Sequence, residues 1–355
     1  MADHPSIPRL AARIAAGLVL ALACPLAAEK TDVVVFDNGD RLTGEVKKLE
    51  RGKLAFKTDA TDTIQIEWED VASLVAGESF DVETRAGARY FGSLVQAAEE
   101  GKLEVAGKEE SWTLDLGSVV RLTPIEAGFW KRVDGSLDLG FSFTEADDRT
   151  QVSVGAETEY RTRKYLRSLS LSSVVVSQPQ RGAEDDEVQE TNRSDLNLFV
   201  TRYLRKPRRH FLGFATLQRN EELGLDLRSL AGAAAGWYVV QSNTEILGLA
   251  AGLAVSREQL AGSDPSQESL EAFLGLQFQS FKFDTPERDV DLTLAVFPGL
   301  SESGRVRAEL NAKVRWEIVK DFFFGLSLLE SYDNEPPAGT VKSDLTLTTS
   351  LGWSF

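Results

Sequence analysis

The strongest constraint on the fold is a two-residue alternation of apolar and polar side chains, which recurs from about residue 131 to residue 355. The clearest stretch is 305–318, where apolar residues occupy one face and charged or amide residues the other. Successive side chains of a β-strand point to opposite faces, so this period predicts strands. A long face of ionised residues is rare inside a β-sandwich but typical of a strand between lipid and an aqueous lumen.

Twelve segments with this pattern follow one another, which is an even number, as bacterial single-chain barrels have. Each is long enough to cross a bilayer as a tilted strand. The expected fold class is therefore all-β, with an antiparallel transmembrane β-barrel of about 12 strands over residues 128–355. The predicted strands are 135–144, 150–163, 165–177, 192–204, 209–219, 225–240, 244–256, 268–282, 288–298, 304–318, 321–332 and 342–355.

The last predicted strand ends with SDLTLTTSLGWSF, residues 343–355. Its alternation places Leu351, Trp353 and Phe355 on one face. A terminal aromatic residue behind alternating apolar residues resembles the assembly signal of bacterial outer-membrane barrels. These three residues are therefore the predicted assembly signal, which the barrel assembly machinery would read.

Residues 1–28 have the order of a secretory signal peptide: a basic start, an apolar run over 14–24 and small residues before Glu29. The apolar run is too short to span a bilayer as a helix. Cleavage after Ala28 is expected, and lipidation at Cys24 is the alternative, because residues 21–24 (ALAC) loosely resemble a lipobox. Export and a barrel together predict the outer membrane of a Gram-negative bacterium.

Residues 29–127 contain an internal repeat. Residues 39–46 (GDRLTGEV) align with 87–94 (GARYFGSL) at an offset of 48, and further glycines and leucines follow at nearly the same offset. Short alternating strands and an Asn38-Gly39 turn indicate a small SH3-like β unit in each copy. A unit of about 45 residues is marginal alone, so we expect a tandem module that packs as one body in the periplasm.

The amino-acid composition argues against several kinds of binding and catalytic site. A net charge of −16 is a poor match for nucleic acid, and one Cys with two His argues against a Cys- or His-based metal centre. No cofactor is expected. Outer-membrane hydrolases pair a His with Ser or Asp, but His210 follows a basic turn without such a partner motif, so no catalytic residue and no enzyme is predicted. The carboxylates of the first copy are interpreted as structural rather than as an acid pair or a cation site, since Asp37 and Asp40 flank a turn and Glu67 and Glu69 share the polar face of a strand. The remaining carboxylate of this set is Asp70.

The predicted loops sort by length and charge. The loops 178–191, 257–267 and 333–341 are long and would face the cell exterior, whereas the opposite turns are short and basic. Four adjacent carboxylates in the first of these loops are candidates for weak divalent-cation binding, since Ca²⁺ and Mg²⁺ prefer such oxygens. The alternative is a solvated acidic loop. The candidates are Glu184, Asp185, Asp186 and Glu187.

Residues 36–46 (FDNGDRLTGEV), their fainter echo at 80–94 and a barrel ending in Phe together resemble the family of salt-induced outer membrane proteins, a domain of unknown function. The likeness covers roughly 32–355 and includes residues 225–229 (LDLRS). The second repeat departs from the pattern, with Tyr90-Phe91 where the first has Leu42-Thr43. The resemblance implies an outer-membrane barrel and, through its label, a link to salt stress, and it transfers no catalytic residues.

Two functions from different classes remain open. The first is a structural or interaction protein of the envelope, whose partners are outer-membrane lipid and a periplasmic protein or the cell wall, the latter through residues 29–127. The alternative is a narrow pore for ions or small solutes, because about twelve strands lie between packed small barrels and open porins. A hydrolase is a distant third.

Overall fold

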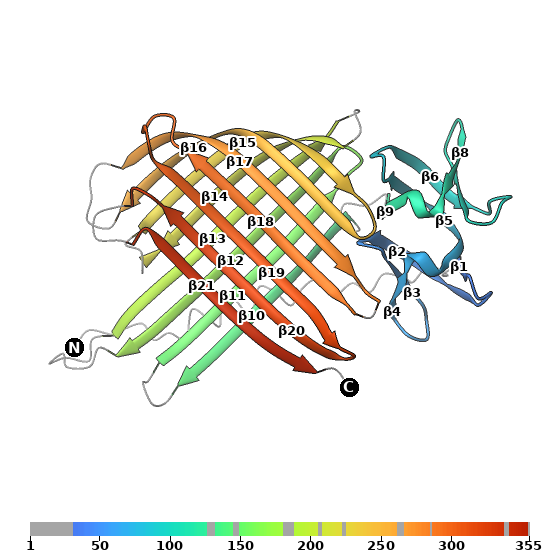
Figure 1. Cartoon of the computed structure of the whole chain (residues 1–355), viewed down its shortest axis with the longest axis horizontal. Helices are drawn as coiled ribbons and strands as arrows, with labels where there is room; N and C mark the ends of the chain where they lie inside the picture. The colour runs from blue at the N-terminus through green and yellow to red at the C-terminus, as the bar shows by residue number, and fades with distance from the viewer. Residues whose placement is uncertain are drawn as a thin grey trace, which may run out of the picture.

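The computed structural model describes residues 31–125, 132–144, 149–179, 188–204, 208–221, 225–260, 266–284, 286–336 and 341–353. These residues form two antiparallel β-sheets and two short 3-10 turns (Figure 1). None of the described residues belongs to a helix long and apolar enough to cross a membrane. The predicted signal peptide with Cys24, the acidic residues at 184–187 and Phe355 lie outside the described residues.

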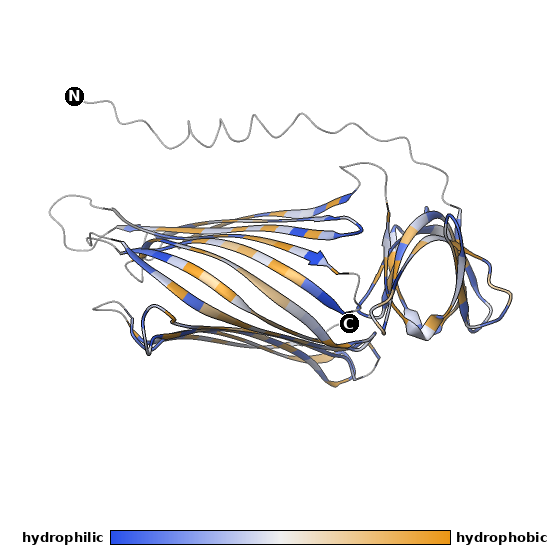
Figure 2. Ribbon diagram, turned by 90° about the horizontal axis from the view of Figure 1, so that it is seen from above, coloured by the Kyte–Doolittle hydropathy of each residue, from blue (hydrophilic) through white to orange (hydrophobic). Residues whose placement is uncertain are grey.

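The N-terminal sheet, called the small sheet below, has nine strands in the order β4-β3-β2-β1-β5-β6-β7-β8, with β9 paired to β2 and β5. Figure 2 shows it as a small ring beside the second sheet. Its elements are β1 (Asp32–Phe36), β2 (Arg41–Glu50), β3 (Lys53–Lys57), β4 (Thr63–Glu67), η1 (Trp68–Asp70), β5 (Val71–Thr84), β6 (Arg89–Val95), β7 (Lys102–Ala106), β8 (Ser111–Asp115), η2 (Leu116–Ser118) and β9 (Val119–Pro124).

The repeat in the sequence is also a repeat in the structure. The two 3-10 turns η1 and η2 are 48 residues apart. The turn glycines Gly39 and Gly87 both have positive φ angles, +86° and +78°, which only glycine adopts easily. Their turns close with equivalent bonds, from the Phe36 N–H to the Asp40 carbonyl and from the Thr84 N–H to the Ala88 carbonyl, each 2.9 Å. Strand β5 is shared, since its two halves belong to successive copies.

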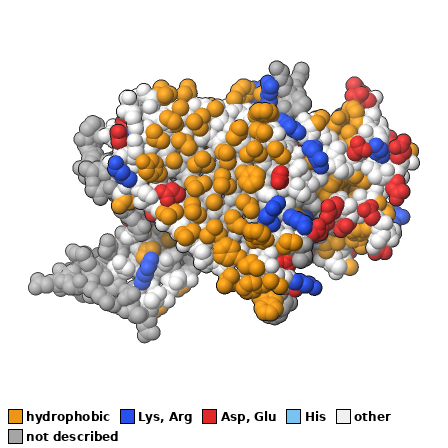
Figure 3. Space-filling view, in the orientation of Figure 1, with side chains coloured by type: hydrophobic (Ala, Val, Ile, Leu, Met, Phe, Trp, Pro, Cys, Tyr) orange, Lys and Arg blue, Asp and Glu red, His pale blue; other side chains and the backbone are white. Residues whose placement is uncertain are grey.

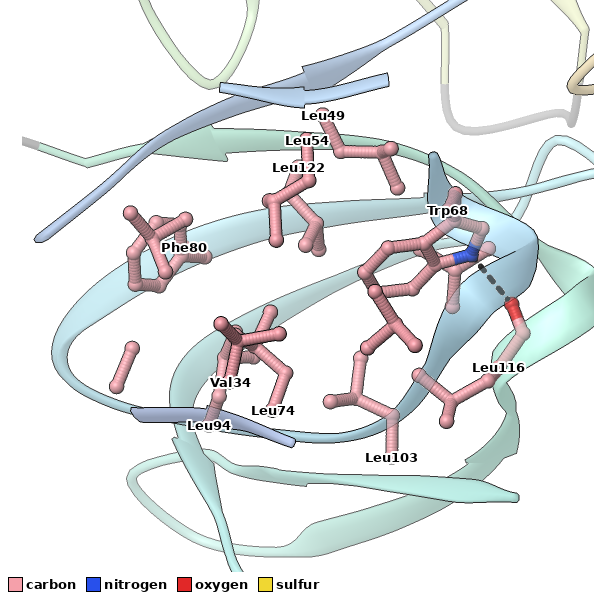
Figure 4. Close-up of a cluster of buried hydrophobic side chains, with 14 of the residues drawn as sticks. Val34, Leu49, Leu54, Trp68, Leu74, Phe80, Leu94, Leu103, Leu116 and Leu122 are labelled. Carbon is pink, nitrogen blue, oxygen red and sulfur yellow. Dashed lines mark hydrogen bonds between the residues drawn. The ribbon is translucent and has the colours of Figure 1, made fainter. Parts of the chain in front are cut away.

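A single apolar core fills the small sheet, and both copies contribute to it (Figure 4). Because neither copy encloses this core alone, the two fold as one unit, as expected for such short repeats. The buried side chains include Val34, Leu49, Leu54, Trp68 and Leu74 from the first copy and Phe80, Leu94, Leu103, Leu116 and Leu122 from the second.

The C-terminal sheet, called the large sheet, has twelve antiparallel strands paired in sequence order, which confirms the predicted count. In Figure 1 it curls so that one group of strands lies in front of another, with the small sheet beyond one end. The strands are β10 (Val133–Thr144), β11 (Arg149–Arg161), β12 (Tyr165–Pro179), β13 (Val188–Tyr203), β14 (Arg209–Asn220), β15 (Leu225–Gln241), β16 (Glu245–Leu260), β17 (Gln267–Lys282), β18 (Arg288–Pro298), β19 (Val306–Val319), β20 (Phe322–Asp333) and β21 (Ser343–Trp353).

Two hairpins extend further than their sequence pattern predicts. Strands β12 and β13 pair as far as Pro179 and Val188, inside the predicted loop 178–191. Strands β16 and β17 likewise pair as far as Glu258 and Gln267. Backbone pairing needs no apolar side chains, so a ladder continues past the point where the hydrophobic alternation stops.

The first and last strands of the large sheet are not joined by a hydrogen-bonded ladder in the described part of the chain. Strands β10 and β21 are accordingly exposed along almost their whole length on both faces. The large sheet is therefore a curled sheet with two free edges.

The two faces of the large sheet differ in chemistry. Its outer face exposes aliphatic and aromatic side chains, which form the broad apolar surface of Figure 3. Polar residues alternate with these along the strands, as the colours of Figure 2 show. Several of the polar side chains are buried against one another on the inner face. Arg307 on β19, for example, binds the buried Glu271 of β17, while neighbouring Leu270 is exposed. The alternation predicted for 305–318 therefore separates an outer apolar from an inner polar face.

Candidate functional site

The small sheet docks against one end of the large sheet, at the turns that connect β11 to β12, β13 to β14, β15 to β16 and β17 to β18 (Figure 1). We call this contact region the junction. It is built from two turns of the small sheet, at Arg51-Gly52 and at Arg85, together with strands β6 and β9. The junction joins residues that are distant in sequence, so it exists only in the folded chain.

Arg51 of the small sheet contacts several side chains of the large sheet. It lies at the tip of the β2–β3 turn with a φ of +53°, which is costly for a residue with a side chain. Its guanidinium forms an ion pair with Asp289 of β18 and lies 3.5 Å from a carboxylate oxygen of Asp291. The same group lies 4.8 Å above the ring of Phe281, a favourable cation–π distance. Backbone strain at this tip therefore accompanies a specific set of contacts.

Two further turns of the large sheet meet the small sheet. The Asn243 side-chain amide donates to the Val119 carbonyl at 2.9 Å. Arg208, with a φ of +62°, donates to the Arg85 carbonyl at 2.6 and 3.1 Å. Several separate turns of the large sheet therefore hold the small sheet.

Charged side chains of the small sheet are buried or half-buried at the junction. Arg121 of β9 lies between Glu50, at 3.4 Å, and Glu83, at 3.6 Å. Burial raises the pKa of Glu50, but the positive charges of Arg121 and Lys48 outweigh it and hold that pKa below its ordinary value. Burial in turn raises the pKa of Asp81, although Arg89 binds its carboxylate.

The junction also contains unsatisfied polar atoms. In the described part of the chain, four buried side-chain atoms have no hydrogen-bond partner, and all four belong to residues at or beside the junction. They are Arg51 Nε, His210 Nδ1, Gln241 Oε1 and Asn243 Oδ1. Buried polar atoms are normally paired, so this contact is less complete than the apolar core of the small sheet.

Three carboxylates meet across the junction. Glu67, the last residue of β4, and Glu69 of η1 lie with Asp284 of the β17–β18 turn so that one oxygen of each is within 4.8 Å of the others. Burial and the charge of Asp284 raise the pKa of Glu67, and the charge of Asp284 raises that of Glu69. Oxygens at this spacing suit a hard cation. The sequence predicted only a polar strand face here, because Asp284 lies over 200 residues away.

A second charged cluster lies at the opposite end of the large sheet, and we call it the far-end cluster. Arg305 donates to Asp333 at 2.7 Å and to Glu258 at 3.1 Å. Arg307 forms two bonds with Glu271, at 2.6 and 2.9 Å. All these charges except Asp333 are nearly completely buried, so the inner face here is filled by paired charges.

The predicted residues have different outcomes. Leu351 and Trp353 lie on β21 and are exposed, while Phe355 lies outside the described residues, so their assembly role stays a prediction. The cation candidates at 184–187 also lie outside them. His210 packs its ring 4.9 Å from that of Tyr238, and no described Ser or Asp side chain hydrogen-bonds to it.

Comparison with known proteins adds one relationship. A family model described as "Protein of unknown function, DUF481" matches residues 135–355, which is more than half of the chain and covers almost all of the large sheet. No curated protein matches the chain.

Proposed function

Because the chain belongs to the DUF481 family of proteins of unknown function, we propose a role from its own surfaces. It is a β-barrel of the Gram-negative outer membrane that holds the small sheet at its periplasmic end. The outer face of the large sheet is the observation that carries this proposal. No water-exposed protein surface of this size is expected to be so apolar.

The distribution of aromatic residues supports a membrane location. Trp237, Trp316 and Trp353 are each more than half exposed, and each lies near the end where the small sheet docks. Phe141 and Phe143 are exposed near the opposite end. Aromatic girdles at both ends of an apolar band are typical of membrane barrels. In lipid the free edges of β10 and β21 would have to pair, because unsatisfied backbone groups are too costly there.

The inner face supports a structural rather than a conducting role. The far-end cluster fills one end with paired charges, and Arg51 of the small sheet binds Asp289 at the other. Between them Phe214, Phe273 and Phe297 pack together, with ring centroids 4.8 and 5.5 Å apart. The protein would therefore act by presenting the small sheet to a periplasmic partner or the cell wall, and not as an enzyme.

Other parts of the proposal rest on sequence. The signal peptide over 1–28 would deliver the chain to the barrel assembly machinery, which reads Leu351, Trp353 and Phe355. The resemblance to salt-induced outer membrane proteins suggests that expression responds to osmotic stress. Quantifying the protein in cells grown at low and high salt tests that link.

Fractionation of cells that express the full chain tests the membrane location. We expect the protein in the outer-membrane fraction, with a band that shifts on heating before electrophoresis, as folded barrels do. Protease added to intact cells should leave the small sheet uncut, and permeabilised cells should lose it. Recovery of the folded protein from the periplasmic fraction would contradict the proposal.

One observation favours the pore alternative. Glu309, Asn311 and Lys313 are exposed on the inner face between the two charged ends, as residues that line water would be. If the small sheet undocks, it no longer closes its end of the inner space, and only the far-end cluster closes the other end. Single-channel recording in planar bilayers distinguishes the functions: the intact chain should not conduct, whereas steady discrete currents would establish a pore.

A further inference from the structure

A cavity of about 430 Å³ lies where the β11–β12 hairpin meets the small sheet. The small sheet contributes Asp81 and residues 123–125, and the large sheet contributes Arg132 and residues 161–165. The cavity is separate from the Arg51 and Arg208 contacts. Cavities of this size accommodate small ligands or the headgroups of larger ones.

The wall of this cavity carries excess positive charge. It contains Arg132, Arg161, Arg163 and Lys164 but a single carboxylate, Asp81. Of these cations, Arg161 is paired with Glu159 at 3.3 Å. Asp81 is already neutralised, because Arg89 contacts both of its oxygens, with the Nε-to-Oδ1 bond at 3.1 Å. Among the described residues, no carboxylate pairs with Arg163 or Lys164. Arg163 and Lys164 are exposed at the mouth of the cavity, so an anion that enters can reach both without displacing a carboxylate from either.

The turn of the β11–β12 hairpin fixes the backbone positions of two of these cations. The Thr162 N–H donates to the Tyr165 carbonyl at 2.8 Å, and the Thr162 hydroxyl accepts from the Tyr165 N–H at 3.0 Å. This closed turn leaves Arg163 and Lys164 at its two central positions. The Arg163 guanidinium lies 4.9 Å above the ring of Phe91 on β6, which orients the group without neutralising it.

We propose that this cavity binds a phosphate group, and specifically the phosphate of a membrane phospholipid headgroup. An arginine fork and an ammonium group beside each other match the oxygens of phosphate. The choice of a lipid as the source rests on the proposed membrane location. Free phosphate, or another phosphate ester, has the same recognition chemistry.

The surface beside the cavity favours a lipid. Arg167 lies 5.7 Å from the ring of Tyr160 and 5.6 Å from that of Tyr165. Leu169 and Leu171, further along the same strand, are exposed. Aromatic and basic residues next to an apolar band mark the level of lipid headgroups. A lipid can therefore place its phosphate in the cavity and its acyl chains along β12.

Bound phosphate would also strengthen docking. Both sheets contribute to the wall, so a ligand that binds only the docked arrangement stabilises it by mass action. The phospholipid would then act as a bridge between the barrel and the small sheet.

Calorimetric titration of the full chain in neutral detergent tests the proposal. The probes are dihexanoyl phosphatidylglycerol, inorganic phosphate and dihexanoyl glycerol, which lacks phosphate. Arg163→Gln with Lys164→Gln should weaken phosphatidylglycerol binding by about tenfold or more, since two charge-assisted contacts are lost. Arg163→Lys with Lys164→Arg should retain most of the binding and shows that the hairpin still folds.

The matched control removes two cations at the same end of the barrel. Arg209→Gln with Lys320→Gln has the same change in net charge, on hairpins that do not line the cavity. It should bind phosphatidylglycerol with nearly unchanged affinity. Equal losses in both double variants would overturn the site in favour of general charge attraction, and equal affinity of Arg163→Gln/Lys164→Gln and the unaltered protein would also overturn it.

The three probes distinguish a phospholipid headgroup from free phosphate as the source of the bound phosphate group. Tight binding of phosphatidylglycerol alone supports the lipid, whereas equal affinity for inorganic phosphate supports the phosphate site and overturns the lipid assignment. Binding of dihexanoyl glycerol as strong as that of phosphatidylglycerol would overturn the phosphate site. Inorganic phosphate binding needs no membrane. If the fractionation experiment contradicts the membrane location, the titration with inorganic phosphate therefore still tests the phosphate site.

Discussion

The Trp68 indole N–H donates to the carbonyl of Leu116 at 2.9 Å, and these two residues are equivalents in the two copies of the repeat, 48 positions apart. Figure 4 shows this bond at the edge of the shared core. Trp68 begins η1 and Leu116 begins η2, so the two copies meet through matching parts. The same equivalence provides matched controls for experiments on the junction.

Gly52 and Gly101 make one such pair. Both have nearly the same positive φ, +72° and +73°, so alanine costs each about 1–2 kcal/mol of backbone strain. A Cβ at Gly52 would lie 2.6 Å from the Asn243 carbonyl oxygen, whereas a Cβ at Gly101 meets nothing within 4 Å. Gly52→Ala should therefore expose the junction to limited proteolysis, and Gly101→Ala should not. Equal cleavage of the two variants would contradict docking at this turn.

The ion pair of Arg51 with Asp289 should stabilise docking. A double-mutant cycle with Arg51→Ala and Asp289→Ala isolates their interaction. We expect a coupling of about 0.5–1 kcal/mol in denaturant unfolding, because both side chains are partly exposed. Lys57→Ala, which removes a pair with the exposed Asp62, is the control and should have a smaller effect. A coupling of zero would mean that the contact does not hold the sheets together.

The three carboxylates at the junction predict a pH dependence. The pKa values of Glu67 and Glu69 are raised above the ordinary 4.5 by burial and by Asp284. A raised pKa in the docked state means that docking is weakened while these groups are charged. Docking should therefore strengthen as pH falls from 7 through the raised pKa values, which hydrogen exchange in the β17–β18 turn can measure.

Variants that lack the two charges test whether docking strengthens as pH falls. Glu67→Gln with Glu69→Gln should strengthen docking at pH 7 and remove most of its dependence on pH. Glu109→Gln with Glu110→Gln, in the β7–β8 turn, removes the same charge elsewhere and should preserve that dependence. Docking that weakens on acidification of the unaltered protein would contradict the repulsion.

Adjacent positions on β19 test which face meets lipid. Arginine at Leu310 would lie on the outer apolar face, whereas arginine at Asn311 would lie on the inner polar one. In a membrane, Leu310→Arg should destabilise the barrel by about 2–4 kcal/mol, and Asn311→Arg should be tolerated. Urea unfolding in lipid vesicles measures the difference, and equal midpoints would argue against the membrane.

The end of the chain should control assembly. Phe355→Asp, or Trp353→Asp on β21, should prevent insertion and leave the chain to periplasmic proteases. Thr348→Asp, on the opposite face of this strand, should insert at nearly normal levels. Quantitative blots of outer membranes measure the outcome, and normal levels of Phe355→Asp would exclude the assembly signal.

The amino-acid sequence alone determined most of the secondary structure. The alternation in 305–318 predicted a strand with opposite faces, and the offset of 48 predicted the tandem copies that meet at Trp68 and Leu116. Both predictions succeeded because they depend on local periodicity: a strand exposes every second side chain to the same face, whatever lies far away in the sequence.

Only the tertiary structure decided how the two sheets contact each other. Arg51 and Asp289 are 238 residues apart, and nothing periodic connects them. The carboxylates of Glu67 and Asp284, and the cations of the phosphate cavity, likewise come together only when turns of both sheets dock. Such contacts depend on the relative placement of whole sheets, which is set by the shape and charge of surfaces assembled from distant segments. Local residue patterns therefore fixed the strands and their faces, while packing created the junction.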